Sequence, residues 1–244
     1  MKLAFSLIPL LTAIYLPSCR HTVRPEDSII IAKSYADLQW QPEARHIRHG
    51  HDSKGIMVNT PDTSLPKTLG RRGYWTPGRP ATGMPYKWGG FDTPESFLKG
   101  IAAGKKAGDV VTDEKVTLND DAISRESVGI DCSGFVSRCW KLPAHVSTPH
   151  LPELCDPIEW EDVQAGDMLL RPGHAVLVHY KDVESVHVYE AASIPTSKVV
   201  RRRISFAALK DSVYQPYRYR FMAEPLGEIS DDPTSSFHRH EGRF

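Results

Sequence analysis

Alternation of apolar and polar residues marks the C-terminal half of the chain and predicts β-strands there. In HAVLVHY (174–180) and SVHVYEAA (185–192), β-branched or aromatic residues recur at alternate positions, as they do in half-buried strands. A short apolar run follows Gly166-Asp167, and KVVRRRI (198–204) and YRYRF (217–221) have a similar character. We therefore expect these segments to form strands, with a turn of helix at 206–209.

Apolar residues at helical spacing predict helices in the preceding half. Residues 28–40 read as one amphipathic helix that ends near Trp40, and a second helix begins at Pro94 and ends in glycines. A third begins at 132, where Asp131 is a suitable N-cap. Its expected buried stripe consists of Phe135, Val136, Cys139 and Trp140.

Three stretches lack sustained periodicity. Residues 43–83 predict a long loop or an extended strap, and 108–122 predict a polar, irregular segment. The acidic residues of 108–122 do not follow the spacing of a calcium loop, so a solvated loop is favoured over a metal site. The polar end at 226–244, with His238 and His240, is expected to be a disordered tail. We expect neither a metal ion nor a cofactor.

Charge points to no polyanionic partner. The 244 residues contain 30 Lys and Arg and 30 Asp and Glu, a formal net charge of zero, so we expect no nucleic-acid partner. The run Arg201-Arg202-Arg203 is interpreted as a solvated strand end, with phosphate or anionic-lipid contact as the alternative. The length favours one core domain with appendages.

The first residues resemble an export signal. Residues 1–18 have a basic second position, an apolar stretch and a turn-forming end, and they are too short for a convincing membrane span. Leu16-Pro17-Ser18-Cys19 resembles a bacterial lipobox, which would make Cys19 an acylated mature N-terminus anchored to a membrane. Plain secretion, or a periplasmic location, is the alternative.

The remaining cysteines are odd in number. Cys132, Cys139 and Cys155 leave at least one unpaired thiol in the monomer. On one helix, Cys132 and Cys139 would be separated by a rise of about 10 Å, beyond the limit for a disulfide. Cys155 remains as a local partner for either.

Cys132 is the candidate nucleophile. In the first turn of a helix, free N–H groups and the helix dipole favour a thiolate over a thiol. A buried structural cysteine is the alternative interpretation. A cysteine nucleophile also needs a base and a group that orients the base, so the neighbouring histidines decide between the two.

A register argument selects among His174, His179 and His187. A hairpin with its loop at 181–183 would place His174 opposite Glu190, with Val178 opposite Val186 and Val176 opposite Val188. His174 and Glu190 would then share a face with four valines, while His179 and His187 point to the other face. A strand-edge histidine and a surface carboxylate are the alternatives. However, two such groups on one apolar face are costly unless they pair.

Taken in order, these segments are similar to a known family. Tyr86-Lys87-Trp88-Gly89-Gly90, Asp131-Cys132-Ser133-Gly134-Phe135-Val136, Gly166-Asp167, His174-Ala175-Val176 and Glu190-Ala191-Ala192-Ser193 resemble the NlpC/P60 family of papain-like cysteine peptidases of the cell wall. The resemblance implies an α+β papain-like fold, in which a nucleophile helix packs on a central antiparallel sheet. It also implies hydrolysis of amide bonds in peptidoglycan stem peptides, commonly between γ-D-glutamyl and a diamino acid.

The resemblance also implies roles and boundaries. Cys132 would be the nucleophile, His174 the general base and then acid, Glu190 the orienting group, and Tyr86 an oxyanion donor. Glu190 stands where the family most often has His. The implied divisions are a signal peptide at 1–18, a helix and strap at 19–82, and a catalytic domain at 83–225 that contains an insertion at 91–130.

Two other functions remain open. A cysteine amidase or acyltransferase acting on another substrate would use the same nucleophile and base. An envelope-binding protein without catalysis would retain the fold, although the intact Cys, His, carboxylate and Tyr set argues against it.

Overall fold

The computed structural model describes residues 22–224, which form a mixed α+β fold. The expected leader, Cys19 and the polar tail from residue 225 on lie outside the described residues. Among the helices that are described, none is both long and apolar enough to span a membrane.

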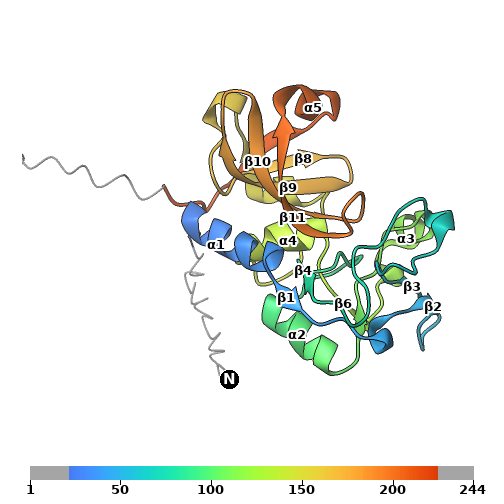
Figure 1. Ribbon diagram of the computed structural model, residues 1–244. Coiled ribbons are helices and arrows are strands. Elements are labelled where there is room, and N and C mark those ends of the chain that lie inside the picture. The colour runs from blue at the N-terminus through green and yellow to red at the C-terminus, as the bar shows by residue number, and fades with distance from the viewer. Residues whose placement is uncertain (1–21, 225–244) are drawn as a thin grey trace, which may run out of the picture.

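A six-stranded antiparallel sheet forms the centre of the fold (Figure 1). The strands run in the order β11-β10-β9-β8-β12-β7, so strands that follow one another in sequence pair as hairpins from β8 to β11. The strands are β7 (Cys155–Pro157), β8 (Met168–Arg171), β9 (His174–Lys181), β10 (Ser185–Ala192), β11 (Lys198–Ser205) and β12 (Gln215–Tyr219). The strands predicted near 168, 174, 185, 198 and 217 are confirmed.

The two faces of the sheet are covered by different helices. Ala175, Leu177 and Tyr189 point into a core shared with α1 (Pro25–Ala36) and α4 (Cys132–Cys139). The alternate residues Val176, Val178, Val186 and Val188 form a second core, which Leu209 of α5 (Phe206–Asp211) completes. Figure 1 shows α1 and α4 together on one side of the sheet and α5 at its far end.

The helix that begins at Cys132 forms as predicted. The Asp131 carboxylate accepts a hydrogen bond of 2.6 Å from the Gly134 N–H, and the expected stripe from Phe135 to Trp140 is buried. Trp140 donates 2.9 Å to the Gly166 carbonyl, which joins the end of α4 to the turn before β8. In that turn Asp167 is buried against Arg218, so its role there is structural.

Glycine is needed where α4 meets the turn before the insertion. A Cβ at Gly134 would lie 2.2 Å from the Gly90 carbonyl oxygen. A Cβ at Gly90 would in turn lie 2.6 Å from the Gly129 carbonyl oxygen and 2.8 Å from the Ile130 Cα. These glycines allow the backbones to approach closely, so they are explained by packing alone.

The first helix is shorter than its apolar pattern indicates. It ends at Ala36, and Trp40 lies in β1 (Gln39–Trp40), paired with β4 (Ala81–Thr82). The prediction that the helix continues to Trp40 is wrong. The Trp40 ring packs edge-on against Trp75 and Phe97, so tertiary packing draws it into an extended segment.

The strap and the insertion form a second group of elements beside the sheet (Figure 1). The strap contains η1 (Ala44–His46), β2 (His49–His51), β3 (Met57–Asn59) and η2 (Lys67–Leu69). The insertion contains α2 (Pro94–Ala102), β5 (Lys106–Ala107), α3 (Asp113–Leu118), η3 (Asn119–Ala122) and β6 (Ser127–Val128). The chain between α4 and β8 contains η4 (Leu151–Leu154) and η5 (Trp160–Asp162).

The irregular segment predicted at 108–122 instead contains α3 and η3. Thr112 caps α3, and its hydroxyl accepts a hydrogen bond from the Lys115 N–H. The Lys115 ammonium is buried, 2.7 Å from the Asp109 carboxylate and 2.7 Å from the Met57 carbonyl. Burial raises the pKa of Asp109 to about 6, although Lys115 opposes that shift. The contact between Lys115 and Met57 joins residues that are far apart in sequence and leaves no periodic signal. This explains why the helix was not predicted.

Candidate active site

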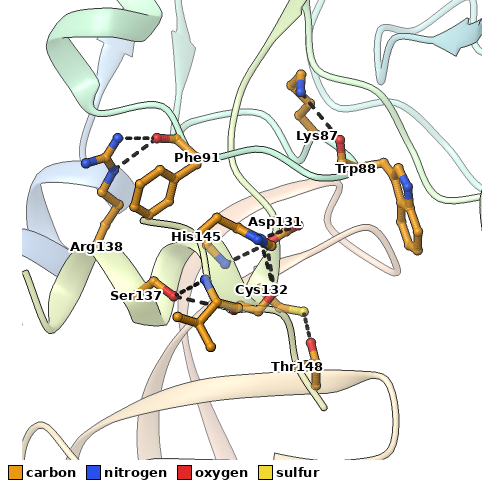
Figure 2. A network of polar contacts seen from close by, with 12 residues as sticks. Lys87, Trp88, Phe91, Asp131, Cys132, Ser137, Arg138, His145 and Thr148 are labelled. Atoms are coloured by element: carbon orange, nitrogen blue, oxygen red, sulfur yellow. Dashed lines mark hydrogen bonds and ion pairs between the residues drawn. The ribbon is translucent and has the colours of Figure 1, made fainter. Parts of the chain in front are cut away.

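Cys132 lies at the start of α4, with its sulfur in a confined space. The residue is only 6% exposed, and its Sγ lies 3.7 Å from the Thr148 hydroxyl (Figure 2). No described residue accepts a hydrogen bond from the Cys132 backbone N–H, as expected in the first turn of a helix. A thiol and a free amide donor therefore stand together at the positive end of a helix.

His174 and Glu190 form the expected imidazole–carboxylate pair. His174 Nε2 lies 2.7 Å from Glu190 Oε1, and the two side chains are 11% and 4% exposed. Arg202 on β11 lies 3.1 Å from the second carboxylate oxygen. With Nε2 engaged by the carboxylate, Nδ1 is the ring nitrogen left to face another group.

Cys132 is the other neighbour of the His174 ring. Burial lowers the pKa of His174, but hydrogen bonding and charge from Cys132 and Glu190 outweigh burial and raise that pKa to about 9. The environment therefore favours a protonated imidazole at neutral pH. An imidazolium between a thiol and a carboxylate can stabilise a thiolate and deliver a proton.

The hairpin reaches this pairing through a register that differs from the predicted one. Val188 faces Val178 rather than Val176, and a bulge at His187/Val188 separates this pair from Val186 opposite Lys181. The predicted register is wrong because the Asp182 carboxylate organises a tighter turn, accepting hydrogen bonds from the N–H groups of Glu184 and Ser185. Past the bulge, the observed pairing differs from the predicted pairing by two residues, since Val178 faces Val188 instead of Val186. His174 and Glu190 therefore keep the same face and meet diagonally.

The other two histidine candidates lie outside this cluster. The His179 ring packs against Tyr180 and Tyr189. His187 stacks on Tyr180 and lies 3.0 Å from Asp182. Neither is among the neighbours that shift the pKa of His174.

Tyr86 is buried close to the cysteine. Burial raises the pKa of Tyr86 well above its usual value, and the negative charges of Cys132 and Asp131 act in the same direction. The phenol therefore stays neutral and can act as a hydrogen-bond donor. Its backbone is fixed on both sides, because the Tyr86 N–H bonds Ser197 and its carbonyl accepts from Asp109.

Two residues near the sulfur were not identified from the sequence. His145 Nε2 lies 3.1 Å from both oxygens of Asp131, and Thr148 contacts Cys132; both belong to the loop that follows α4 (Figure 2). Burial lowers the pKa of His145, but the Asp131 carboxylate outweighs it and raises the pKa. The loop has no periodicity from which these contacts could be predicted.

The remaining thiols are unsuited to chemistry. Cys132, Cys139 and Cys155 are all free, so the disulfide left open for Cys155 does not form. Burial raises the pKa of Cys139 well above its usual value and that of Cys155 to about 12. Of the three, only Cys132 has a base beside it. Within residues 22–224, no group of His, Cys, Asp and Glu has the arrangement of a metal site.

Comparison with known proteins finds no matching family model, no significantly similar curated protein and no significantly similar solved structure.

Proposed function

We propose that this protein is a cysteine hydrolase with a papain-like fold of the NlpC/P60 type, and that it cleaves amide bonds in the stem peptides of peptidoglycan. The observation that carries the proposal is the position of His174, whose ring pairs with Glu190 and also neighbours Cys132 at the start of the buried helix α4. The sequence likeness to the NlpC/P60 family supplies the substrate class.

The proposed reaction begins with a thiolate and an imidazolium. The Cys132 thiolate attacks the amide carbonyl, and the oxyanion accepts hydrogen bonds from the Cys132 N–H and the Tyr86 hydroxyl. His174 then protonates the leaving amine as the C–N bond breaks, which leaves a thioester on Cys132 and a neutral imidazole.

Hydrolysis of the thioester completes the cycle. Neutral His174 takes a proton from water, and the resulting hydroxide attacks the thioester carbonyl. The carboxylic acid leaves, and Cys132 and His174 return to the ion pair. Glu190 orients the ring through Nε2 in both halves of the cycle, and the Arg202 guanidinium forms an ion pair with the same carboxylate.

The test is to incubate the mature protein with purified peptidoglycan and soluble muropeptides and to read the products by mass spectrometry. We expect a new stem-peptide fragment from the wild type and none from folded Cys132→Ala or His174→Ala. Glu190→Gln should lose far more activity than the matched control His187→Ala. Retained hydrolysis in either of the first two variants would refute the mechanism.

The same assay separates hydrolysis from acyl transfer. A thioester on Cys132 that passes to added amines rather than to water would favour an acyltransferase. Selective labelling of Cys132 by a thiol probe, without release of any fragment, would indicate a substrate other than peptidoglycan and favour an amidase.

We further propose that the protein is exported to the bacterial cell envelope and is anchored there through a lipid on Cys19. The support is the lipobox-like Leu16-Pro17-Ser18-Cys19 after an apolar stretch. Metabolic labelling with palmitate should mark the wild type, and Cys19→Ser should abolish the label. Export without labelling would indicate plain secretion.

A further inference from the structure

A cavity of about 780 Å³ opens in the strap. Residues 63–67 and 70–73 line it, so it belongs to the segment between β3 and β4. The volume is in the range of small-ligand sites. None of the residues with a role in the proposed reaction lines this cavity.

The charges on the cavity wall are all positive. Lys67, Arg71 and Arg72 line it, and none of the three forms an ion pair with any residue of the described chain. The chain as a whole has no net charge. Three unpaired cations around one hollow are therefore a local feature, and they favour an anionic occupant.

Arg71 connects the cavity to the active site. Its Nη1 donates 2.7 Å to the Ser193 hydroxyl and its Nε donates 3.3 Å to the Leu69 carbonyl. Within residues 22–224, Nη2 has no hydrogen-bond acceptor. Ser193 follows Glu190 by three residues, just beyond the end of β10, and the Val111 N–H also donates to it at 3.0 Å.

Tyr86 gives a second connection between the cavity and the nucleophile. The Tyr86 backbone N–H donates 2.9 Å to the Ser197 carbonyl, and the Ser197 hydroxyl donates 2.9 Å to the carbonyl of Ser193, the residue that Arg71 contacts. Hydrogen bonds therefore join Arg71 to the backbone of Tyr86. The segment that Arg71 contacts is thus the one that also fixes Tyr86, the proposed oxyanion donor.

We propose that this cavity is a substrate subsite in which Arg71, supported by Lys67 and Arg72, binds a free carboxylate of the peptide cleaved at Cys132. The inference rests on the proposed function and deepens it. A γ-linked glutamyl residue uses its side-chain carboxyl in the peptide bond, so its α-carboxylate is free. A guanidinium with unused donors is suited to such a group, because it binds a carboxylate through two parallel hydrogen bonds.

The test uses two synthetic stem peptides that differ only in whether the α-carboxylate of the γ-glutamyl residue is free or amidated. The wild type should prefer the free acid, mainly through a lower KM. Arg71→Gln should reduce kcat/KM on the free acid by about tenfold or more, and should leave the amidated peptide nearly unaffected. The exposed Arg79→Gln, which does not line the cavity, is the matched control and should behave as the wild type.

Three further variants distinguish the charge of Arg71 from the contacts that support it. Lys67→Gln and Arg72→Gln leave the Ser193 contact intact and should each weaken the preference by a smaller factor. Ser193→Ala keeps the charge of Arg71 and should retain a preference for the free acid. Equal cleavage of both peptides by the wild type and by Arg71→Gln would overturn the subsite while leaving the proposed function standing.

Binding to the inactive protein separates the two proposals. Calorimetric titration of Cys132→Ala should show tighter binding of the free acid, and this difference should vanish in Cys132→Ala/Arg71→Gln. If the wild type cleaves neither peptide, the proposed function fails, and this titration still decides the subsite: a difference that depends on Arg71 supports it, and no difference overturns it.

Discussion

At the scale of single residues, His174 lies between a carboxylate and a thiol, and these neighbours determine which proton it holds. Burial alone would keep the imidazole neutral, because a buried cation loses its hydration. The pKa of His174 is nevertheless raised to about 9, through Cys132 and Glu190. The ring therefore holds its proton at neutral pH, as the proposed role of proton donor to a leaving amine requires.

The raised pKa predicts how stability changes with pH. A histidine in the unfolded chain has a pKa of about 6.5, so the folded protein keeps a proton that the unfolded chain releases as pH rises from about 6.5 to about 9. This stabilisation is fully present below that window and is lost through it, by at most about 3 kcal/mol. Urea unfolding near pH 6 and pH 9.5 should show the decline in wild type.

His174→Gln is the matched variant for this decline. The glutamine cannot titrate, so the free energy of unfolding of this variant should change less across the same window. The decline belongs to the His174 and Cys132 pair rather than to one residue, since the two groups interact closely. Parallel pH profiles for the wild type and His174→Gln would contradict the assignment.

Thr148 leads to a prediction about the sulfur. Its hydroxyl lies 3.7 Å from Cys132 Sγ and can donate to a thiolate. Thr148→Val keeps the shape and removes the donor, so alkylation of Cys132 by iodoacetamide at neutral pH should slow several-fold, about as expected for one weak hydrogen bond to a charged group. Thr117→Val on α3, whose hydroxyl bonds only its own helix, is the control. An unchanged rate in Thr148→Val would show that the hydroxyl does not support the thiolate.

Periodicity determines which site residues the sequence could indicate. Cys132 and Glu190 lie in elements with a clear apolar pattern, and His174 begins such an element. The helix cap therefore indicated the position of Cys132, and the alternation along the strands indicated the shared face of His174 and Glu190. Thr148 and His145 lie in an aperiodic loop, and their contacts depend on where that loop folds back over α4. Such contacts are set by tertiary structure and leave no local pattern.

At the scale of elements, the β9–β10 hairpin shows what the alternation of side chains along a strand can and cannot predict. The sequence indicated the two strands and the shared face of His174 and Glu190, but not the bulge at His187/Val188. A shift of two residues returns every side chain to its own face, whereas a shift of one would not. The predicted facing pairs were therefore wrong, while the shared face of His174 and Glu190 was predicted correctly.

The start of α4 gives a prediction about packing. Gly134→Ala would place a Cβ 2.2 Å from the Gly90 carbonyl oxygen, a contact with backbone that cannot rotate away. We expect Gly134→Ala to lower the free energy of unfolding by about 1–3 kcal/mol, as overpacked sites do. Gly50→Ala in β2 is the matched control, because nothing lies within 4 Å of its added Cβ. Equal midpoints in urea for both variants would refute the close approach.

At the scale of the whole molecule, one apolar core joins segments that are far apart in sequence. The buried cluster that contains Phe135 of α4 also contains Val23, Tyr35, Trp40 and Trp75 from the region before the insertion. The described ends meet as well: the Val23 N–H donates 2.9 Å to the Phe221 carbonyl, and the Ala223 N–H donates 2.8 Å to the Val23 carbonyl. The N-terminal helix α1 is thereby held against α4 and the last strands.

Substitution of Tyr35 tests whether α1 and α4 share one core. Its ring packs edge-on against Phe135 with centroids 5.6 Å apart, and its hydroxyl donates 3.0 Å to the Asp92 carbonyl at the start of the insertion. Tyr35→Ala removes both contacts and leaves a cavity beside α4, so it should cost about 3–5 kcal/mol. Tyr35→Phe removes only the hydroxyl and should cost about 1 kcal/mol.

The unfolding curve distinguishes a shared core from a separable helix. If α1 belongs to the same cooperative unit as α4, Tyr35→Ala should shift a single urea transition that near-UV circular dichroism and Cys132 alkylation report at the same midpoint. If α1 were an independent attachment, the variant would lose helix signal first and keep Cys132 protected to the wild-type midpoint. Because Phe135 lies one helical turn after Cys132, we expect the first outcome, with the Cys132 thiol exposed as soon as the N-terminal helix is released.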